Sequence, residues 1–469
     1  MRRGGGAGRP PGSLGGVRTI HLHDTASGTL KPLTPREPGK VGIYACGPTV
    51  YNRIHVGNAR PFVVYALLKR FLQHEGLEVT LVANLTDVND KIYAAATRQG
   101  IPSADLAREM GDLYRADTDL LGLGRPDHEP LVTTSMDAII DLIAALIERD
   151  AAYAAEGDVY FRVRRDDRYG SISHRDVDQM DQGEGDDRSS LKDDPLDFAL
   201  WKATKPGEDT AWDAPWGRGR PGWHIECSAM AESLLGVGFE IHGGGSDLVF
   251  PHHENEAAQT RCARDAELAQ IWMHNGMLQL RGEKMAKSVG NVTPLHEAVA
   301  EVGRDALLLL FCGAHYRQPV QFSDETIEQA QAGVRRIREA ARELEPGDSP
   351  TELSAHREAF LAALADDFNT AGALAHLWGW VRDANRRGAQ GAATGDADLR
   401  LMLGLLGLEN LLQADDGPDA DALALLERRQ AARAAKDWAA ADALRDELAQ
   451  RGWTVRDGAE GARLVRSEA

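Results

Sequence analysis

Residues 41–86 contain the feature that most restricts the fold of this chain. "VGIYAC" at 41–46 is a short apolar run with the character of a buried strand, and "LEVTLVANLT" at 77–86 is another. Between them, "GNARPFVVYALLKRFLQHEG" at 57–76 has the apolar spacing of an amphipathic helix. Strand, helix and strand within about 45 residues predict a βαβ unit. We therefore expect an α/β fold built on a doubly wound, Rossmann-like parallel sheet.

The loops that follow these strands are the expected place for ligands, because doubly wound sheets bind them beyond the carboxyl ends of their strands. Cys46 ends the first strand and residues 84–86 end the second. "HVGN" at 55–58 opens the helix, and a helix N-terminus attracts phosphate through its free N–H groups. His55 and Asn58 are three residues apart and would face one ligand; an ordinary helix cap is the alternative interpretation.

A second candidate site is the segment "PHHENE", which follows a glycine-rich stretch. On a helix His252 and Glu256 share one face, whereas His253 would lie about 100° round the axis. With Cys46 and with Cys227 from "GWHIECSAM", they form a set of ligands that suits Zn²⁺. Three alternatives stay open: a solvated helix start that complements the dipole, cysteines that only fill space, and His253 in place of His252.

Two further segments have the chemistry of phosphate and ribose binding. "KMAKS" at 284–288 contributes Lys284 and Lys287, which would neutralise the charge that builds up as pyrophosphate leaves. "GGGSD" offers backbone donors and Asp247, a carboxylate able to accept from ribose hydroxyls. The alternatives are an exposed basic loop for the first segment and a plain glycine-rich turn for the second.

Composition limits the class of protein. The formal charge of −19 argues against a non-specific nucleic-acid coat, although residues 428–469 carry nine Lys or Arg against seven Asp or Glu. No apolar run reaches the ~20 residues that span a bilayer, so we expect a cytoplasmic protein without membrane contact. The four cysteines are far apart, which favours thiols or metal ligands over disulfides. We expect Cys262 and Cys312 to be packing residues.

The order of these motifs resembles that of the cysteinyl-tRNA synthetases, which are class I aminoacyl-tRNA synthetases. The motifs are, in order, the strand ending in Cys46, HVGN, GWHIECSAM, GGGSDLVFPHHENE and KMAKS. The resemblance runs from about residue 20 to the end of the chain and includes "DDFNTAGAL" and "AKDWAAADALRDELAQRGWTVRDG". It implies a catalytic domain, a helical bundle and a small anticodon-binding module. The expected divisions are a disordered tail at 1–18, the Rossmann-like catalytic domain at 19–110 and 200–282, a connective insertion at 111–199, a KMSKS-type loop and stem-contact region at 283–322, the bundle at 323–412 and the anticodon-recognition module at 421–469.

The resemblance also implies roles for individual residues, together with one Zn²⁺ per chain and Mg²⁺ bound with ATP. The zinc ligands would be Cys46, Cys227, His252 and Glu256. ATP would be bound by His55, Asn58, Lys284, Lys287 and Asp247, and the first four of these would be the catalytic residues. The cysteinyl adenylate would contact Thr49, Thr86, Trp223 and Asp247. Two departures from the family pattern are Asn58, where H-x-G-H has its second histidine, and Ala286, where K-M-S-K-S has serine.

The implied activity is that of a monomeric cysteine–tRNA ligase with ATP, L-cysteine and tRNA(Cys) as partners. It would form cysteinyl-adenylate and then transfer the cysteinyl group to tRNA. One alternative is the mycothiol-pathway ligase that joins cysteine to glucosaminyl-inositol by the same chemistry. A second is an inactive zinc-containing RNA-binding protein, which only Asn58 favours, and a third is a purely structural zinc. Whether Glu256 stays bound when cysteine binds is left open by the sequence.

Overall fold

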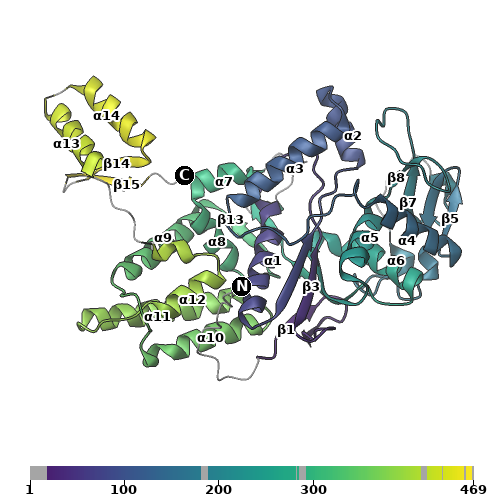
Figure 1. Cartoon of the computed structure of the whole chain (residues 1–469), viewed down its shortest axis with the longest axis horizontal. Helices are drawn as coiled ribbons and strands as arrows, with labels where there is room; N and C mark the ends of the chain where they lie inside the picture. Colours follow the sequence, from purple (N-terminus) through teal and green to yellow (C-terminus); the bar gives the residue numbers. More distant parts are fainter. Residues whose placement is uncertain are drawn as a thin grey trace, which may run out of the picture.

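The centre of the protein is a four-stranded parallel sheet (Figure 1). Its spatial order is β10 (Ala269–Asn275), β9 (Phe239–Gly245), β3 (Lys40–Ala45) and β4 (Glu78–Ala83). All three pairs of neighbouring strands are parallel, which confirms the predicted fold class. The computed structural model describes residues 18–180, 189–280, 283–284, 292–413, 420–435, 437–458 and 461–466.

The predicted βαβ unit is present as β3, α1 (Val56–His74) and β4. From β3 the chain winds outward to β4 on one side, and β9, α6 (Glu254–Arg264) and β10 wind outward on the other. The direction of winding therefore reverses between β3 and β9, and their carboxyl ends form the crevice where such sheets bind ligands. The backbone N–H of Cys46 donates to the Gly243 carbonyl at 2.9 Å and extends this strand pair.

The glycine-rich segment is not the plain turn that was the alternative interpretation, because its three glycines lie within β9. A Cβ atom on Gly243 would lie 2.1 Å from the hydroxyl of Tyr65 in α1. That hydroxyl donates to the Met273 carbonyl at 2.6 Å and is buried between helix and sheet. Gly243 thus allows α1 to pack closely on the sheet, and the turn begins only at Ser246.

A second, antiparallel sheet follows α2 (Asp90–Gln99), α3 (Ser103–Asp119) and α4 (Met136–Glu148). It extends to Pro221, beyond the insertion end suggested at residue 199, because β7 (Phe198–Ala203) pairs with β6 (Asp158–Phe161) and with β8 (Gly219–Pro221). The chain then enters α5 (Trp223–Leu235) directly and returns to the parallel sheet. The remaining strand of this sheet is β5 (Ala152–Ala155).

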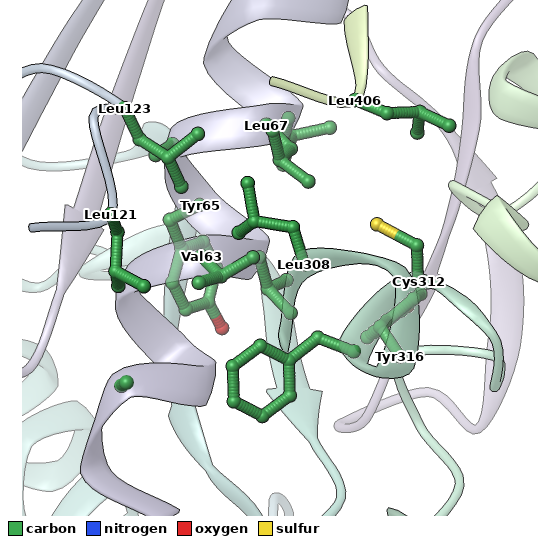
Figure 2. Packing of buried hydrophobic residues seen from close by; sticks show 14 of the residues in the cluster. Val63, Tyr65, Leu67, Leu121, Leu123, Leu308, Cys312, Tyr316 and Leu406 are labelled. Carbon is green, nitrogen blue, oxygen red and sulfur yellow. The ribbon is translucent and has the colours of Figure 1, made fainter. Parts of the chain in front are cut away.

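The helical region after the parallel sheet shares one hydrophobic core with it. Figure 2 shows Leu67 of α1 against Leu308 of α8, with the sulfur of Cys312 near Leu406. Cys312 is therefore a packing residue, as expected. The elements of this region are β11 (Leu278–Leu280), β12 (Glu283–Lys284), β13 (Val320–Phe322), α7 (Leu295–Val302), α8 (Arg304–Cys312), α9 (Asp324–Arg342), α10 (Ser354–Ala365), α11 (Thr370–Ala389) and α12 (Ala397–Leu405).

The C-terminal unit has a small core of its own and lies apart from the bundle in Figure 1. It consists of α13 (Ala420–Ala434), α14 (Trp438–Gln450) and the hairpin β14 (Trp453–Gly458) and β15 (Gly461–Arg466). A hairpin at the other end of the chain, β1 (His21–Asp24) and β2 (Thr29–Pro32), was not predicted. Within the described residues, no helix has the length and apolar character needed to cross a membrane.

Arg60 joins α1 to the helical region through a buried guanidinium group. The side chain is 1% exposed, and burial lowers its pKa to about 10. It donates to backbone carbonyls of two loops, one between β10 and β11 and the other between α8 and β13. These carbonyls belong to Gly276, Met277, His315, Tyr316 and Gln318.

We predict that Arg60→Met lowers the free energy of unfolding by about 3 kcal/mol, because it removes the buried hydrogen bonds that the guanidinium group donates to five backbone carbonyls. Urea denaturation followed by circular dichroism measures the change. Arg98→Met, at an exposed position of α2, is the matched control and should have little effect. Equal stability of the two variants would contradict the role given to Arg60.

Candidate metal centre and active-site cleft

Two thiols, an imidazole and a carboxylate meet at the carboxyl ends of β3 and β9. Their potential ligand atoms lie within 4.8 Å of one another, and all four residues are buried. They are Cys46, Cys227, His252 and Glu256, the set that the sequence suggested. Glu256 Oε1 lies 2.9 Å from His252 Nε2 and 3.6 Å from Cys46 Sγ. Segments up to 210 residues apart in sequence are thus brought to one point.

Two glycines fix the positions of the cysteines. A Cβ atom on Gly47 would lie 1.7 Å from the Asn84 carbonyl oxygen, so only glycine lets the chain after Cys46 pass the end of β4. The Gly47 N–H also donates to Asn84 Oδ1 at 2.9 Å. A Cβ atom on Gly222 would lie 2.0 Å from the Ala199 carbonyl oxygen, so α5, which carries Cys227, starts directly against β7.

The charges of the four side chains depend on one another. Burial alone would raise the pKa of Glu256, but His242 and His252 hold it well below its ordinary value. A hydrogen bond from Cys46 lowers the pKa of Cys227 to about 6, whereas burial and the anionic neighbours raise the pKa of Cys46. Despite burial, Glu256 and Cys227 raise the pKa of His252 to about 10. Without an ion, these shifts favour an anionic Glu256 and Cys227 beside a neutral Cys46 thiol and a protonated His252.

These residues fit a divalent cation. Among the described residues, no lysine or arginine forms an ion pair with Glu256, whose partners are histidines. Two thiols and a carboxylate buried together need positive charge, and thiolate with imidazole is the donor chemistry of zinc. A second set with His253 also has its potential ligand atoms within 4.8 Å of one another: Cys46, His242, His253 and Glu256. The first set has two thiols and suits zinc better.

Further histidines surround the cluster, and the sequence analysis did not identify them. His252 Nδ1 lies 2.9 Å from Nδ1 of His224, and His253 Nδ1 lies 2.7 Å from His274 Nε2. Such partners fix the orientation of a ligating imidazole ring. Their one signal in the sequence is a polar residue within an apolar segment, as in "IWMHNG" and "GWHIEC".

A cleft with a cavity volume of about 260 Å³ opens beside Cys46. The indole of Trp223 stacks on His252 with ring centroids 4.4 Å apart and forms part of its wall. Thr86 is not in the lining, because it is buried and its hydroxyl donates to Glu226 at 3.1 Å. Five of the predicted site residues line the cleft: Cys46, Thr49, Asn58, Trp223 and Asp247.

The N-terminus of α1 lies at the same cleft. His55 is the N-cap residue, and Asn58 Oδ1 accepts from its backbone N–H at 3.2 Å. Asn58 therefore caps the helix, the alternative noted from the sequence, while it also lines the cleft. Backbone hydrogen bonds between residues 54–56 and 293–295 bring the chain after KMAKS to this point. Lys284 lies in β12, and Lys287 lies outside the described residues.

The chain is similar to known proteins along most of its length. The family of class I (C) tRNA synthetase catalytic domains matches residues 32–332, and the cysteinyl-tRNA ligase anticodon-binding domain family matches residues 415–463. A cysteine–tRNA ligase of Brevibacillus brevis is 42% identical over 95% of this chain and 99% of its own. One of Halorhodospira halophila is 43% identical over 96% of this chain and 100% of its own.

The chain belongs to the cysteine–tRNA ligase family. A DALR domain family also matches residues 359–409, within the helical bundle. Solved class I synthetases share the fold. Methionyl-tRNA synthetase of Mycobacterium tuberculosis with methionyl-adenylate has a TM-score of 0.58 at 18% identity, covering 79% of this chain and 88% of that chain. An Agrobacterium radiobacter LeuRS ternary complex has a TM-score of 0.60 at 13% identity, covering 81% and 85%.

We predict that this member of the cysteine–tRNA ligase family binds one zinc ion and that Cys227→Ala lowers its zinc affinity at least about tenfold, since even changes around a ligand have that effect. Mass spectrometry of metal content after dialysis against a competing chelator measures it. Cys312→Ala, in the apolar core, is the control and should retain its zinc. Zinc retention by Cys227→Ala equal to that of the control would show that Cys227 is not a ligand.

Proposed function

We propose that the protein activates L-cysteine with Mg²⁺-bound ATP and transfers the cysteinyl group to tRNA(Cys). The observation that carries this proposal is the position of Cys46. It belongs to the buried two-thiol cluster and also lines the cleft that reaches the N-terminus of α1. A substrate in that cleft would thus place its side chain at a sulfur-binding cluster and its phosphates at a helix N-terminus.

Cysteine must be selected over serine, which differs by one atom. A plain pocket separates side chains that are nearly the same size by about 10²-fold or less. Cys46, Cys227, His252 and Glu256 would hold one Zn²⁺, which when bound supplies a position that prefers a thiolate to a hydroxyl. The chain would hold that position rigidly, because the four ligands come from the residue after β3, from α5, from the segment leading into α6 and from α6 itself.

The remaining groups would orient the cysteinyl moiety and the adenosine. Trp223 is 38% exposed and is held against His252, so it presents one face of its ring to the cleft. Thr49 pairs with Thr86 through a backbone β-bridge, and the buried Thr86 hydroxyl donates a hydrogen bond to Glu226. Asp247 is exposed at the rim, where its carboxylate would accept from ribose hydroxyls.

Neither reaction step needs a nucleophile from the protein. In the first, the cysteine carboxylate attacks the α-phosphate of ATP and pyrophosphate leaves. In the second, a terminal ribose hydroxyl of tRNA attacks the adenylate carbonyl and AMP leaves. Catalysis would then rest on positioning and on stabilising phosphate charge. His55 and Asn58 at the start of α1, with Lys284 and Lys287, are the residues we assign to that task.

The acceptor is proposed from the C-terminal part of the chain. An anticodon-binding family matches residues 415–463, which favours tRNA over an amino sugar as the acceptor. In this proposal residues 421–469 contact the anticodon and the bundle spans the distance to the acceptor end. The protein would act as a monomer in the cytoplasm.

We predict cysteine-dependent exchange between ATP and pyrophosphate, with kcat/KM for serine lower by more than the ~10²-fold that a plain pocket allows. AMP release should then require tRNA(Cys) and should not respond to glucosaminyl-inositol. Zinc-loaded protein without any exchange would support the inactive RNA-binding alternative. Release driven by the amino sugar would instead support the mycothiol-pathway alternative.

A further inference from the structure

His242 is a buried histidine at the metal cluster that belongs to neither the predicted ligands nor the cleft wall. It lies in β9, where it is paired with Tyr44 of the neighbouring strand β3, and it is 0% exposed. Its Nε2 atom lies 3.1 Å from Glu256 Oε2 and 3.5 Å from Cys46 Sγ. Glu256 thus has its two oxygens in different surroundings, since Oε1 faces His252 at 2.9 Å.

Aromatic rings hold the His242 ring in one orientation. Tyr44 stacks on it with ring centroids 5.2 Å apart, and Trp272 packs at 4.6 Å. Phe239 lies at 5.8 Å, and the His253 ring meets it edge-on at 4.7 Å. Because these rings belong to three neighbouring strands and the segment before α6, His242 is unable to turn without disturbing the core.

The polar contacts of His242 are all on one side of the ring. Its Nδ1 atom is buried without a hydrogen-bond partner, while Nε2 faces Glu256 and Cys46. A proton on Nε2 would point at these two acceptors, whereas a proton on Nδ1 would be buried unpaired. We therefore assign the N–H to Nε2. His242 Nε2 approaches Glu256 Oε2 to 3.1 Å, although the geometry is not that of a regular hydrogen bond.

We propose that His242 is a positioning residue that reserves a place for the substrate sulfur. By engaging Oε2, it leaves only Oε1 of Glu256 facing Cys46, Cys227 and His252. Without His242 both carboxylate oxygens are free to turn toward the cluster, and the second oxygen takes the place that the sulfur of cysteine needs. A metal site that acts on a substrate has to keep such a place open. This inference rests on the proposed function.

The test uses Co²⁺ in place of zinc, because its absorption spectrum reports the number and type of ligands. We compare wild type with His242→Phe, which keeps a ring of similar size and removes the N–H. In the variant we expect the cysteine-free spectrum to shift toward higher coordination and the response to added cysteine to diminish. The KM for cysteine should rise about tenfold or more, while the KM for ATP stays unchanged. His242→Gln, which restores an N–H donor, should recover part of the response.

His74→Phe, the same substitution at the exposed end of α1, is the control and should match wild type. His242→Leu repeats the test with a smaller side chain, so that the outcome does not depend on how phenylalanine fits. If His242→Phe and His242→Leu both had the spectra and the cysteine KM of wild type, this inference would be overturned and the proposed function would stand. Loss of the metal from both would make His242 a ligand and overturn it as well. A wild-type protein whose cobalt spectrum ignores cysteine would overturn the proposed function too.

Discussion

Two thiols and a carboxylate, buried together with histidines as their only cationic partners in the described residues, are the constraint on which the site depends. Unbalanced charge of this kind is costly inside a protein, and a thiophilic divalent cation relieves it. The cluster lies at the point where the sheet reverses its winding, beside the cleft that would admit a substrate in the proposed function. In the proposed function, the stability of the site and the selection of the substrate would therefore depend on the same ion.

Much of the surrounding structure fixes the position of this cluster. Gly47 lets β3 and β4 end close together, and Gly243 lets Tyr65 anchor α1 on the sheet. Arg60 then joins the same helix to the helical region through backbone carbonyls. Helix α1 presents its N-terminus to the cleft while its body is part of the shared core (Figure 2). Small displacements of the bundle would therefore change the position of the α1 N-terminus at the cleft.

The sequence predicted the elements with strong periodicity and the residues with distinctive chemistry. The βαβ unit was confirmed, and the structure brings Cys46, Cys227, His252 and Glu256 together as expected. It could not predict His242, because a histidine in an apolar strand has no spacing that reveals its partners. Nor could it place the glycines of β9 in a strand, since that depends on Tyr65 from another element. Contacts between distant segments decided both cases.

The central claim is that the ion held by these four side chains recognises the sulfur of the substrate. Calorimetric binding of cysteine and of serine to zinc-loaded and to zinc-stripped protein tests it most directly. We expect loaded protein to bind cysteine far more tightly than serine, and stripped protein to lose that preference and regain it when zinc is returned. Stripped, folded protein that still prefers cysteine to the same extent would contradict the account.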